Sequence, residues 1–171
     1  GNIYLEKSDY VNALQYYQKG LDLIESTNKK KAGSYLSNIG TIYLHQGIFP
    51  KALEKFQKAL HIAEGQNDKE GVAIAYNNIG VIYGNTGDTT NAVGYFQKSA
   101  DINKELGDKH GMAESYLNIG IIKRAQGEYG IALDLLQQSL ALEKELDNRQ
   151  GIASVYGNIG ETYSAQGNIP L

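Results

Sequence analysis

Few residues of this sequence have the types and spacing that chemistry needs. The three histidines, His45, His61 and His110, stand at unrelated positions without paired carboxylates at ligand spacing, so the sequence predicts no metal site. The glycine-rich stretch 80–87 follows no strand pattern and precedes no Gly-Lys-Ser/Thr, so we do not expect a phosphate-binding loop. No nucleophile beside a base and no carboxylate pair is evident. We therefore expect a protein that is not an enzyme and needs no cofactor.

One polar residue type does recur at a fixed interval. Asn38, Asn78, Asn118 and Asn158 are forty residues apart, each inside a helical apolar pattern, although asparagine is a mediocre helix former. The side-chain amide both donates and accepts, so four in a row could hold the backbone of an extended peptide of about ten residues. The same amides could instead tie each helix to the next within the fold. The sequence leaves both roles open.

Composition and charge narrow the classes of partner. The chain has 171 residues and a net charge of −3, which provides no strong field to attract nucleic acid or an anionic lipid surface. It has no cysteine, and no apolar run is long enough to cross a bilayer. We therefore expect no nucleic-acid or membrane partner for this segment, and a cytoplasmic location.

The elements that position these asparagines belong to an internal repeat. Asn-Ile-Gly recurs every forty residues, at 38–40, 78–80, 118–120 and 158–160. Around it the apolar residues follow steps of three and four, which predicts two helices in each repeat. Further glycines, at 47, 87, 127 and 167, suit the residue after a helix, and Pro50 and Pro170 suit the first turn of the next one. The mid-helix glycines and Ala52, Ala92 and Ala132 predict close approach of helices.

A pair of helices cannot bury its own apolar face, so the repeats must stack. We expect a single solenoid over 1–171, with a partial repeat at 1–30, whole repeats at 31–70, 71–110 and 111–150, and a partial repeat at 151–171. Gly1 falls at the mid-helix glycine of one repeat, and Leu171 falls at the start of a second helix. Because both ends cut a repeat, we expect either a longer parent chain or a neighbouring copy that covers the ends.

The pattern resembles the tetratricopeptide repeat. One repeat carries the residue types of that signature at its offsets, namely Tyr76, Ile79, Gly80, Tyr83, Gly87, Ala92, Phe96 and Ser99. The forty-residue period is similar to the long-period members found in kinesin light chains, Pins-type adaptors, bacterial peptide-sensing regulators and bacterial sensory regions. The resemblance implies an all-α, right-handed superhelical solenoid of antiparallel helix pairs.

The resemblance also implies where a ligand binds, because the first helix of each pair lines the concave groove in this family. Carried over by position, the candidate groove residues are Asn38, Thr41, His45, Asn77, Asn78, Val81, Asn85, Glu114, Asn118, Ile121, Arg124, Asn158 and Glu161. The basic residues with which one subclass clamps chaperone C-terminal tails are replaced by residues such as Ser37, Asn77 and Leu117. We therefore expect a protein or peptide partner, but not an acidic chaperone tail.

Two functions follow as hypotheses. The first is a non-catalytic scaffold whose groove grips an extended segment of a partner, as the sensory or partner-recruiting part of a larger bacterial signalling protein. The second is a structural module that self-associates into dimers or arrays through the solenoid ends or the convex face.

Overall fold

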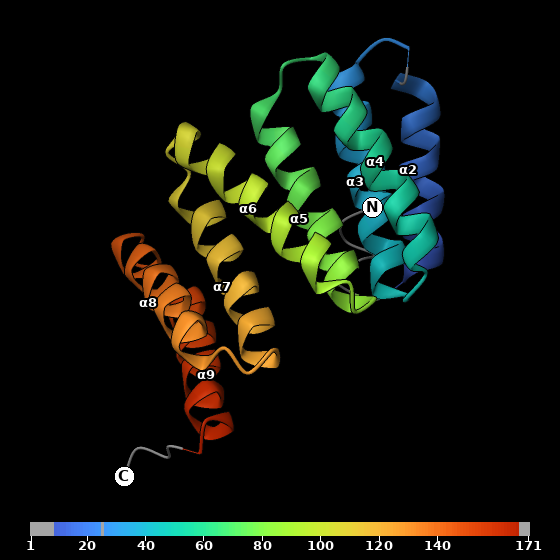
Figure 1. Ribbon diagram of the computed structural model, residues 1–171. Helices are drawn as coiled ribbons and strands as arrows, with labels where there is room; N and C mark the ends of the chain where they lie inside the picture. Colours follow the sequence, from blue (N-terminus) through green and yellow to red (C-terminus); the bar gives the residue numbers. More distant parts are fainter. Residues whose placement is uncertain (1–8, 25, 168–171) are drawn as a thin grey trace.

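The computed structural model describes residues 9–24 and 26–167, and these ranges fold into helices joined by short turns, with no strand among them (Figure 1). The predicted all-α class is therefore confirmed. Gly1, Pro170 and Leu171 lie outside the described residues. The helices are α2 (Tyr10–Ile24), α3 (Lys29–His45), α4 (Phe49–Gly65), α5 (Lys69–Asn85), α6 (Thr89–Leu106), α7 (Lys109–Ala125), α8 (Tyr129–Glu145) and α9 (Arg149–Ala165). None of them is long and apolar enough to cross a membrane.

Glycines end the first helix of each pair, as predicted. The backbone φ angle is positive at Gly47, Gly87, Gly127 and Gly167, with values of 71°, 83°, 78° and 79°. An L side chain is strained in this left-handed region, and glycine is not. The next helix then starts within about two residues, and Pro50 lies in the first turn of α4.

The turns between repeats use side-chain caps. Asp68, Asp108 and Asn148 precede α5, α7 and α9, and each accepts hydrogen bonds from backbone N–H groups of the first turn. These groups have no partner inside the helix, so each cap contributes about 1 kcal/mol to helix stability.

Helices α3, α5, α7 and α9 begin two residues before the predicted repeat boundaries at 31, 71, 111 and 151. The division of the chain into repeats stays a proposal.

The helices stack in chain order from α2 to α9 (Figure 1). Each helix packs on the next one along the chain, and the first helices of adjacent repeats also contact each other, α3 with α5, α5 with α7 and α7 with α9. The second helices α4, α6 and α8 make no mutual contact of comparable extent among the described residues. Because the first helices lie closer together, the stack curves toward them and they form its inner side.

Close approach within each pair explains the mid-helix glycines. A Cβ added at Gly40 would lie 2.7 Å from the Phe56 ring, and one added at Gly80 would lie 2.8 Å from the Phe96 ring. A real side chain would require these packed rings to move. The alanines predicted to mark the same approach are fully buried, at Ala52, Ala92 and Ala132. The predicted packing role is confirmed for Gly40, Gly80 and the three alanines, whereas a Cβ added at Gly160 would meet nothing within 4 Å.

Candidate ligand-binding groove

Three pockets follow the inner side of the stack, each between two first helices and the second helix behind them. The first pocket lies among α3, α4 and α5, the second among α5, α6 and α7, and the third among α7, α8 and α9. Most of their lining residues are equivalent at intervals of forty residues. Ile74 lines both the first and second pockets, and Glu114 lines both the second and third. Together they form one continuous groove.

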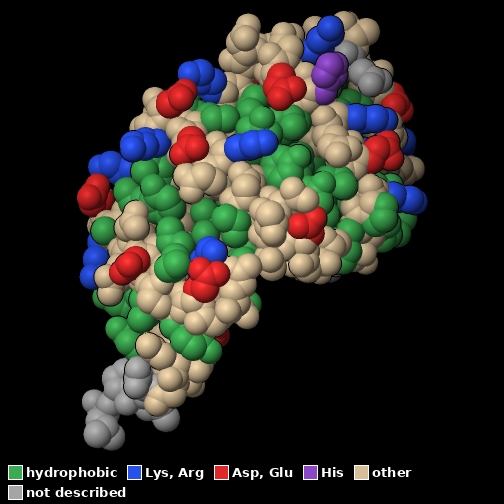
Figure 2. Space-filling view, in the orientation of Figure 1, with side chains coloured by type: hydrophobic (Ala, Val, Ile, Leu, Met, Phe, Trp, Pro, Cys, Tyr) green, Lys and Arg blue, Asp and Glu red, His purple; other side chains and the backbone are tan. Residues whose placement is uncertain are grey.

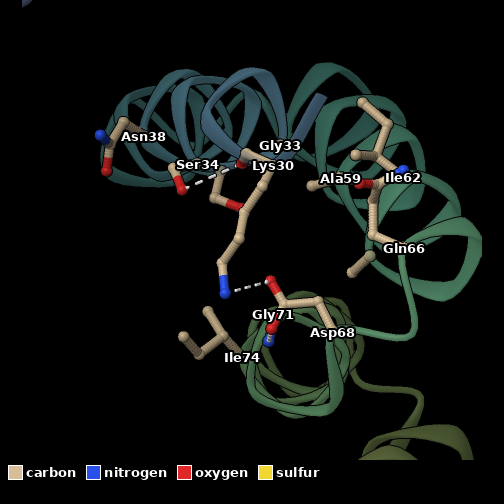
Figure 3. Close-up of a pocket in the computed structure, with 12 residues that line it drawn as sticks. Lys30, Gly33, Ser34, Asn38, Ala59, Ile62, Gln66, Asp68, Gly71 and Ile74 are labelled. Atoms are coloured by element: carbon tan, nitrogen blue, oxygen red, sulfur yellow. Dashed lines mark hydrogen bonds and ion pairs between the residues drawn. The ribbon is translucent and has the colours of Figure 1, made fainter. Parts of the chain in front are cut away.

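The first pocket is mainly apolar, with its charges paired. Figure 3 shows Lys30 reaching from α3 to Asp68 before α5, and the Nζ–Oδ2 distance of this ion pair is 3.1 Å. Ile62 and Ile74 point their apolar side chains toward this space from opposite sides (Figure 3). We call the position at the bottom of the pocket its base position. In the first pocket this position is in the last turn of α4 and holds Ala63, which is buried. An apolar side chain of a ligand fits this lining.

The second pocket has an amide at the same base position. Asn103 is 5% exposed in α6, and its Nδ2 donates to the Ser99 hydroxyl oxygen over 3.4 Å. Ser99 in turn donates to the backbone carbonyl of Ala73 in α5 over 2.9 Å. Glu70 and Glu114 lie at the exposed rim. This pocket is therefore polar and carries more acidic than basic groups.

The third pocket has a carboxylate at its base. Glu143 is 4% exposed in α8 and accepts a hydrogen bond from Asn148 Nδ2 over 2.7 Å. His110 Nδ1 lies 3.4 Å from the other carboxylate oxygen. Gly151 makes room for it, since a Cβ there would lie 2.5 Å from the carboxylate. The three pockets thus differ most at one position, which holds Ala63, Asn103 and Glu143 in turn.

The four regularly spaced asparagines at 38, 78, 118 and 158, which we call the asparagine ladder, lie in different environments. Asn118 Nδ2 donates to Asn77 Oδ1 over 3.3 Å, and Asn77 Nδ2 donates to Glu114 Oε1 over 3.0 Å, so these three side chains join α7 to α5. Asn38 and Asn78 line the first and second pockets and make no side-chain hydrogen bond to any described residue. The geometry therefore gives Asn118 a link between repeats and leaves Asn38 and Asn78 open toward the groove.

Other predicted groove residues bond locally. Asn158 Nδ2 donates to the Ser154 carbonyl over 3.0 Å, and the Thr41 hydroxyl donates to the Ser37 carbonyl over 3.0 Å, both within one helix. His45 lies at the end of α3, where its ring stacks on Tyr10 with centroids 6.3 Å apart. None of the three lines one of the pockets described here.

A fourth hollow lies between the C-terminal halves of α5 and α7. Four predicted residues, Val81, Asn85, Asn118 and Ile121, line it together. Phe96 of α6 is also part of the lining. Asn85 Nδ2 donates to the Val81 carbonyl over 2.8 Å, so its amide is already engaged within α5. This hollow extends the groove with a largely apolar surface.

The predicted basic group of the groove is neutralised within the protein. Arg124 of α7 pairs with Glu161 of α9, so two predicted ligand residues bind each other across adjacent repeats. Its neighbour Lys123 bonds Glu128 over 3.1 Å. Acidic and basic side chains are likewise interleaved over the face shown in Figure 2, without an extended region of one sign.

The sequence reasoning missed Asn103 and Glu143, because it placed ligand residues on the first helices only. A signal was present, since positions 63, 103 and 143 each follow Ala52, Ala92 and Ala132 by eleven residues yet change from apolar to polar to acidic. A repeat position that varies in chemistry inside a regular frame is a candidate for specificity. Within the described ranges, no group of three histidine, cysteine, aspartate or glutamate side chains could hold a metal ion.

The helix pairs, their stacking and the inner groove define an α-solenoid of the kind built from helical repeats. The model of the tetratricopeptide repeat family matches residues 1–65, 71–145 and 111–170. The chain belongs to this family, a generally non-catalytic family of protein-interaction repeats. The resemblance seen in the sequence is therefore confirmed. No curated protein sequence matches the chain.

Solved structures share the fold at low sequence identity. BtubC (BKLC) from P. vanneervenii is 21% identical with a TM-score of 0.84, over 98% of this chain and 70% of that one. Aspartyl phosphate phosphatase F from Bacillus subtilis is 17% identical with a TM-score of 0.86, over 96% and 45%. A Rap protein complexed with competence and sporulation factor is 16% identical with a TM-score of 0.84, over 98% and 47%. The chain thus spans less than half of the last two proteins.

Proposed function

We propose that this chain is a non-catalytic scaffold whose inner groove binds an extended segment of a partner protein or a peptide. The observation that carries the proposal is the row of contiguous pockets, which share Ile74 and Glu114 and repeat in step with the helices. A set of regularly spaced pockets matches a ligand that is itself regular along one direction, as an extended peptide is.

The dimensions support a short linear ligand. Neighbouring packed helices lie about 8–10 Å apart and an extended chain advances about 3.3 Å per residue, so each pocket step corresponds to about three ligand residues. Asn78 lines the second pocket with its side-chain amide open to the groove. The amide can there pair with a peptide group of the ligand, whatever the adjacent ligand side chain is. We propose this backbone role for Asn38 and Asn78, and a role in joining repeats for Asn118.

We further propose that the chain is the sensory or partner-recruiting part of a larger bacterial signalling protein in the cytoplasm. Supporting this are the likeness to a Bacillus subtilis phosphatase and to a Rap protein complexed with a factor, each about twice as long as this chain. At these identities the likeness concerns the fold, so the catalytic activity named for the phosphatase is not extended to this chain. The prediction that acidic chaperone tails do not bind agrees with the acidic rim of the groove.

Selection from a displayed library of random decapeptides tests the groove. Enriched peptides are expected to bind the wild-type chain and to lose affinity for Ile74→Glu, because Ile74 is 49% exposed and lines two pockets. Ile131→Glu is the matched control, since this isoleucine is also 49% exposed but lies on the second helix α8. Failure to enrich any peptide, or equal loss in both variants, would contradict groove binding.

The alternative function is self-association. It is favoured by the apolar side chains exposed on α2, where Val11 and Leu23 are 76% and 78% exposed. Exposed apolar area of this kind drives association when it is contiguous. Light scattering across a range of concentrations tests it: a rise in mass that Val11→Glu abolishes supports the alternative, and a constant monomer mass rejects it.

A further inference from the structure

The base of the third pocket differs from its two equivalents in carrying a buried carboxylate. Glu143 is 4% exposed, whereas the same position holds Ala63 and Asn103 in the first and second pockets. A carboxylate removed from water is costly unless charged or polar donors surround it. The groups that form hydrogen bonds with Glu143 must therefore explain why this carboxylate lies at the base of an open pocket.

The described side chains satisfy only part of the hydrogen-bonding capacity of Glu143. An ionised carboxylate has about four acceptor sites. Asn148 Nδ2 donates to one oxygen over 2.7 Å, and His110 Nδ1 lies 3.4 Å from the other, while no lysine or arginine is among the residues that line this pocket. Acceptor capacity is therefore left for a donor that enters from the groove.

The surroundings reinforce the negative charge. Glu114 stands at the rim of the same pocket, and its carboxylate is engaged by the neutral amide of Asn77 over 3.0 Å. The lysines next to two of the lining residues are committed elsewhere, since Lys109, which precedes His110, pairs with Glu145 over 2.8 Å and Lys144, which follows Glu143, lies over the Tyr156 ring. In the first pocket, by contrast, Lys30 already neutralises Asp68. Two carboxylates thus face the third pocket without a lysine or arginine partner there.

We infer that the third pocket binds a basic side chain, arginine or lysine, of the partner segment, with Glu143 as the charge that receives it. This inference rests on the proposed function, because the groove must first bind an extended segment. The apolar first pocket lies two pocket steps away, so the segment carries an apolar residue and a basic residue about six positions apart. The pocket bases thus set both the composition and the register of the ligand.

Glycines on the facing helices explain how the residue at the base of the pocket can change in size from one repeat to the next. A Cβ at Gly111 would lie 2.3 Å from the Asn103 amide, and one at Gly151 would lie 2.5 Å from the Glu143 carboxylate. At the equivalent Gly71 the nearest side-chain atom is the Ala63 methyl, 3.0 Å away. Glycine on the facing helix therefore leaves space for a larger group at the base, and the base residue changes while the backbone packing stays the same.

The test uses peptides enriched on the full chain from random decapeptides, with affinity measured by fluorescence anisotropy. We expect the enriched sequences to share a basic residue about six positions from an apolar one. Glu143→Gln, which keeps the shape of the side chain, should weaken binding about tenfold or more, because a desolvated charge pair is lost. Replacing the peptide arginine by citrulline should have a similar effect, and the two changes together should cost little more than either alone.

The control is Glu145→Gln, which makes the same change of charge two residues along α8 at a side chain that pairs with Lys109 outside the pocket. It should change affinity by about twofold at most, as exposed ion pairs contribute little. Circular dichroism shows whether Glu143→Gln is folded, and the citrulline peptide tests the same contact on the unaltered chain if it is not.

The outcomes separate the two proposals. Enriched peptides that depend on Ile74 but lack a common basic residue, or that bind Glu143→Gln as well as wild type, would overturn the inference while groove binding stands. If no peptide is enriched, groove binding fails and the inference fails with it.

Discussion

At the scale of single residues, the mid-helix glycines give opposite predictions at equivalent positions. Gly80→Ala places a Cβ about 2.8 Å from the Phe96 ring, so overpacking should lower the free energy of unfolding by about 1–3 kcal/mol. Gly160 is exposed and has no atom within 4 Å of an added Cβ. Gly160→Ala should therefore raise the free energy of unfolding by about 0.5–1 kcal/mol through helix propensity. Urea denaturation measures both changes.

The two variants form a matched pair, because both replace the glycine of Asn-Ile-Gly by alanine. A destabilised Gly160→Ala variant would mean that this glycine also packs against a neighbour, such as a second copy of the chain. An unchanged Gly80→Ala variant would mean that the Phe96 ring moves aside at little cost, and that close helix approach is not the reason for the glycine.

The fold could be predicted because residue types recur at fixed offsets. The site could not be predicted in the same way, because it depends on which side chains come into contact in the folded structure. Glycine and alanine recur because steric room is the same in every repeat, so Gly40 and Ala52 indicated the helix approach correctly. The sequence shows that position 143 varies among the repeats but not that Glu143 is buried in a pocket, because its burial depends on the loop residue Asn148 and on Gly151 of the following helix. Likewise, the sequence places Asn118 on the inner face but not in contact with Asn77, which depends on how closely α5 and α7 approach.

At the scale of helices, the asparagines test how adjacent repeats are joined. Asn118 bonds Asn77 between α7 and α5, whereas Asn78 bonds no described residue through its side chain. We expect Asn118→Ala to lower the free energy of unfolding by about 1 kcal/mol and Asn78→Ala to change it little. With a peptide enriched on the wild-type chain, Asn78→Ala should nevertheless weaken binding. Thermal unfolding and fluorescence anisotropy measure the two effects separately.

Asn78→Asp and Asn118→Asp serve as controls of similar shape, because each retains the acceptor and loses the donor. If Asn78→Ala destabilises the fold as much as Asn118→Ala, the open amide has a structural partner in solution. If neither variant affects peptide binding, the ladder joins repeats only and the pocket bases alone determine affinity.

At the scale of the whole molecule, ion pairs join helices both within one helix pair and between successive pairs of the stack. Lys30 pairs with Asp68, Lys69 with Glu105, and Lys109 with Glu145, and the last two pairs have Nζ–Oε2 distances of 2.8 Å. The first pair joins α3 to the turn before α5, whereas the other two each join the start of a first helix to the end of the second helix of the same pair, α5 to α6 and α7 to α8. Because both partners of these last two ion pairs are more than half exposed, the pairs orient the two helices more than they stabilise their packing.

The pH dependence follows from the sign of one pKa shift. A hydrogen bond from Lys69, reinforced by its charge, lowers the pKa of Glu105 below its ordinary value. A carboxyl with a lower pKa in the folded state contributes stability that is present above the unfolded pKa and lost as the pH falls through the folded pKa. We therefore expect NMR titration to find Glu105 ionising at lower pH than in the Lys69→Met variant, and the contribution to stability to disappear on acidification below about pH 4. Equal titration curves in the two proteins would show that this ion pair does not persist in solution, and that the helices it joins are held by packing alone.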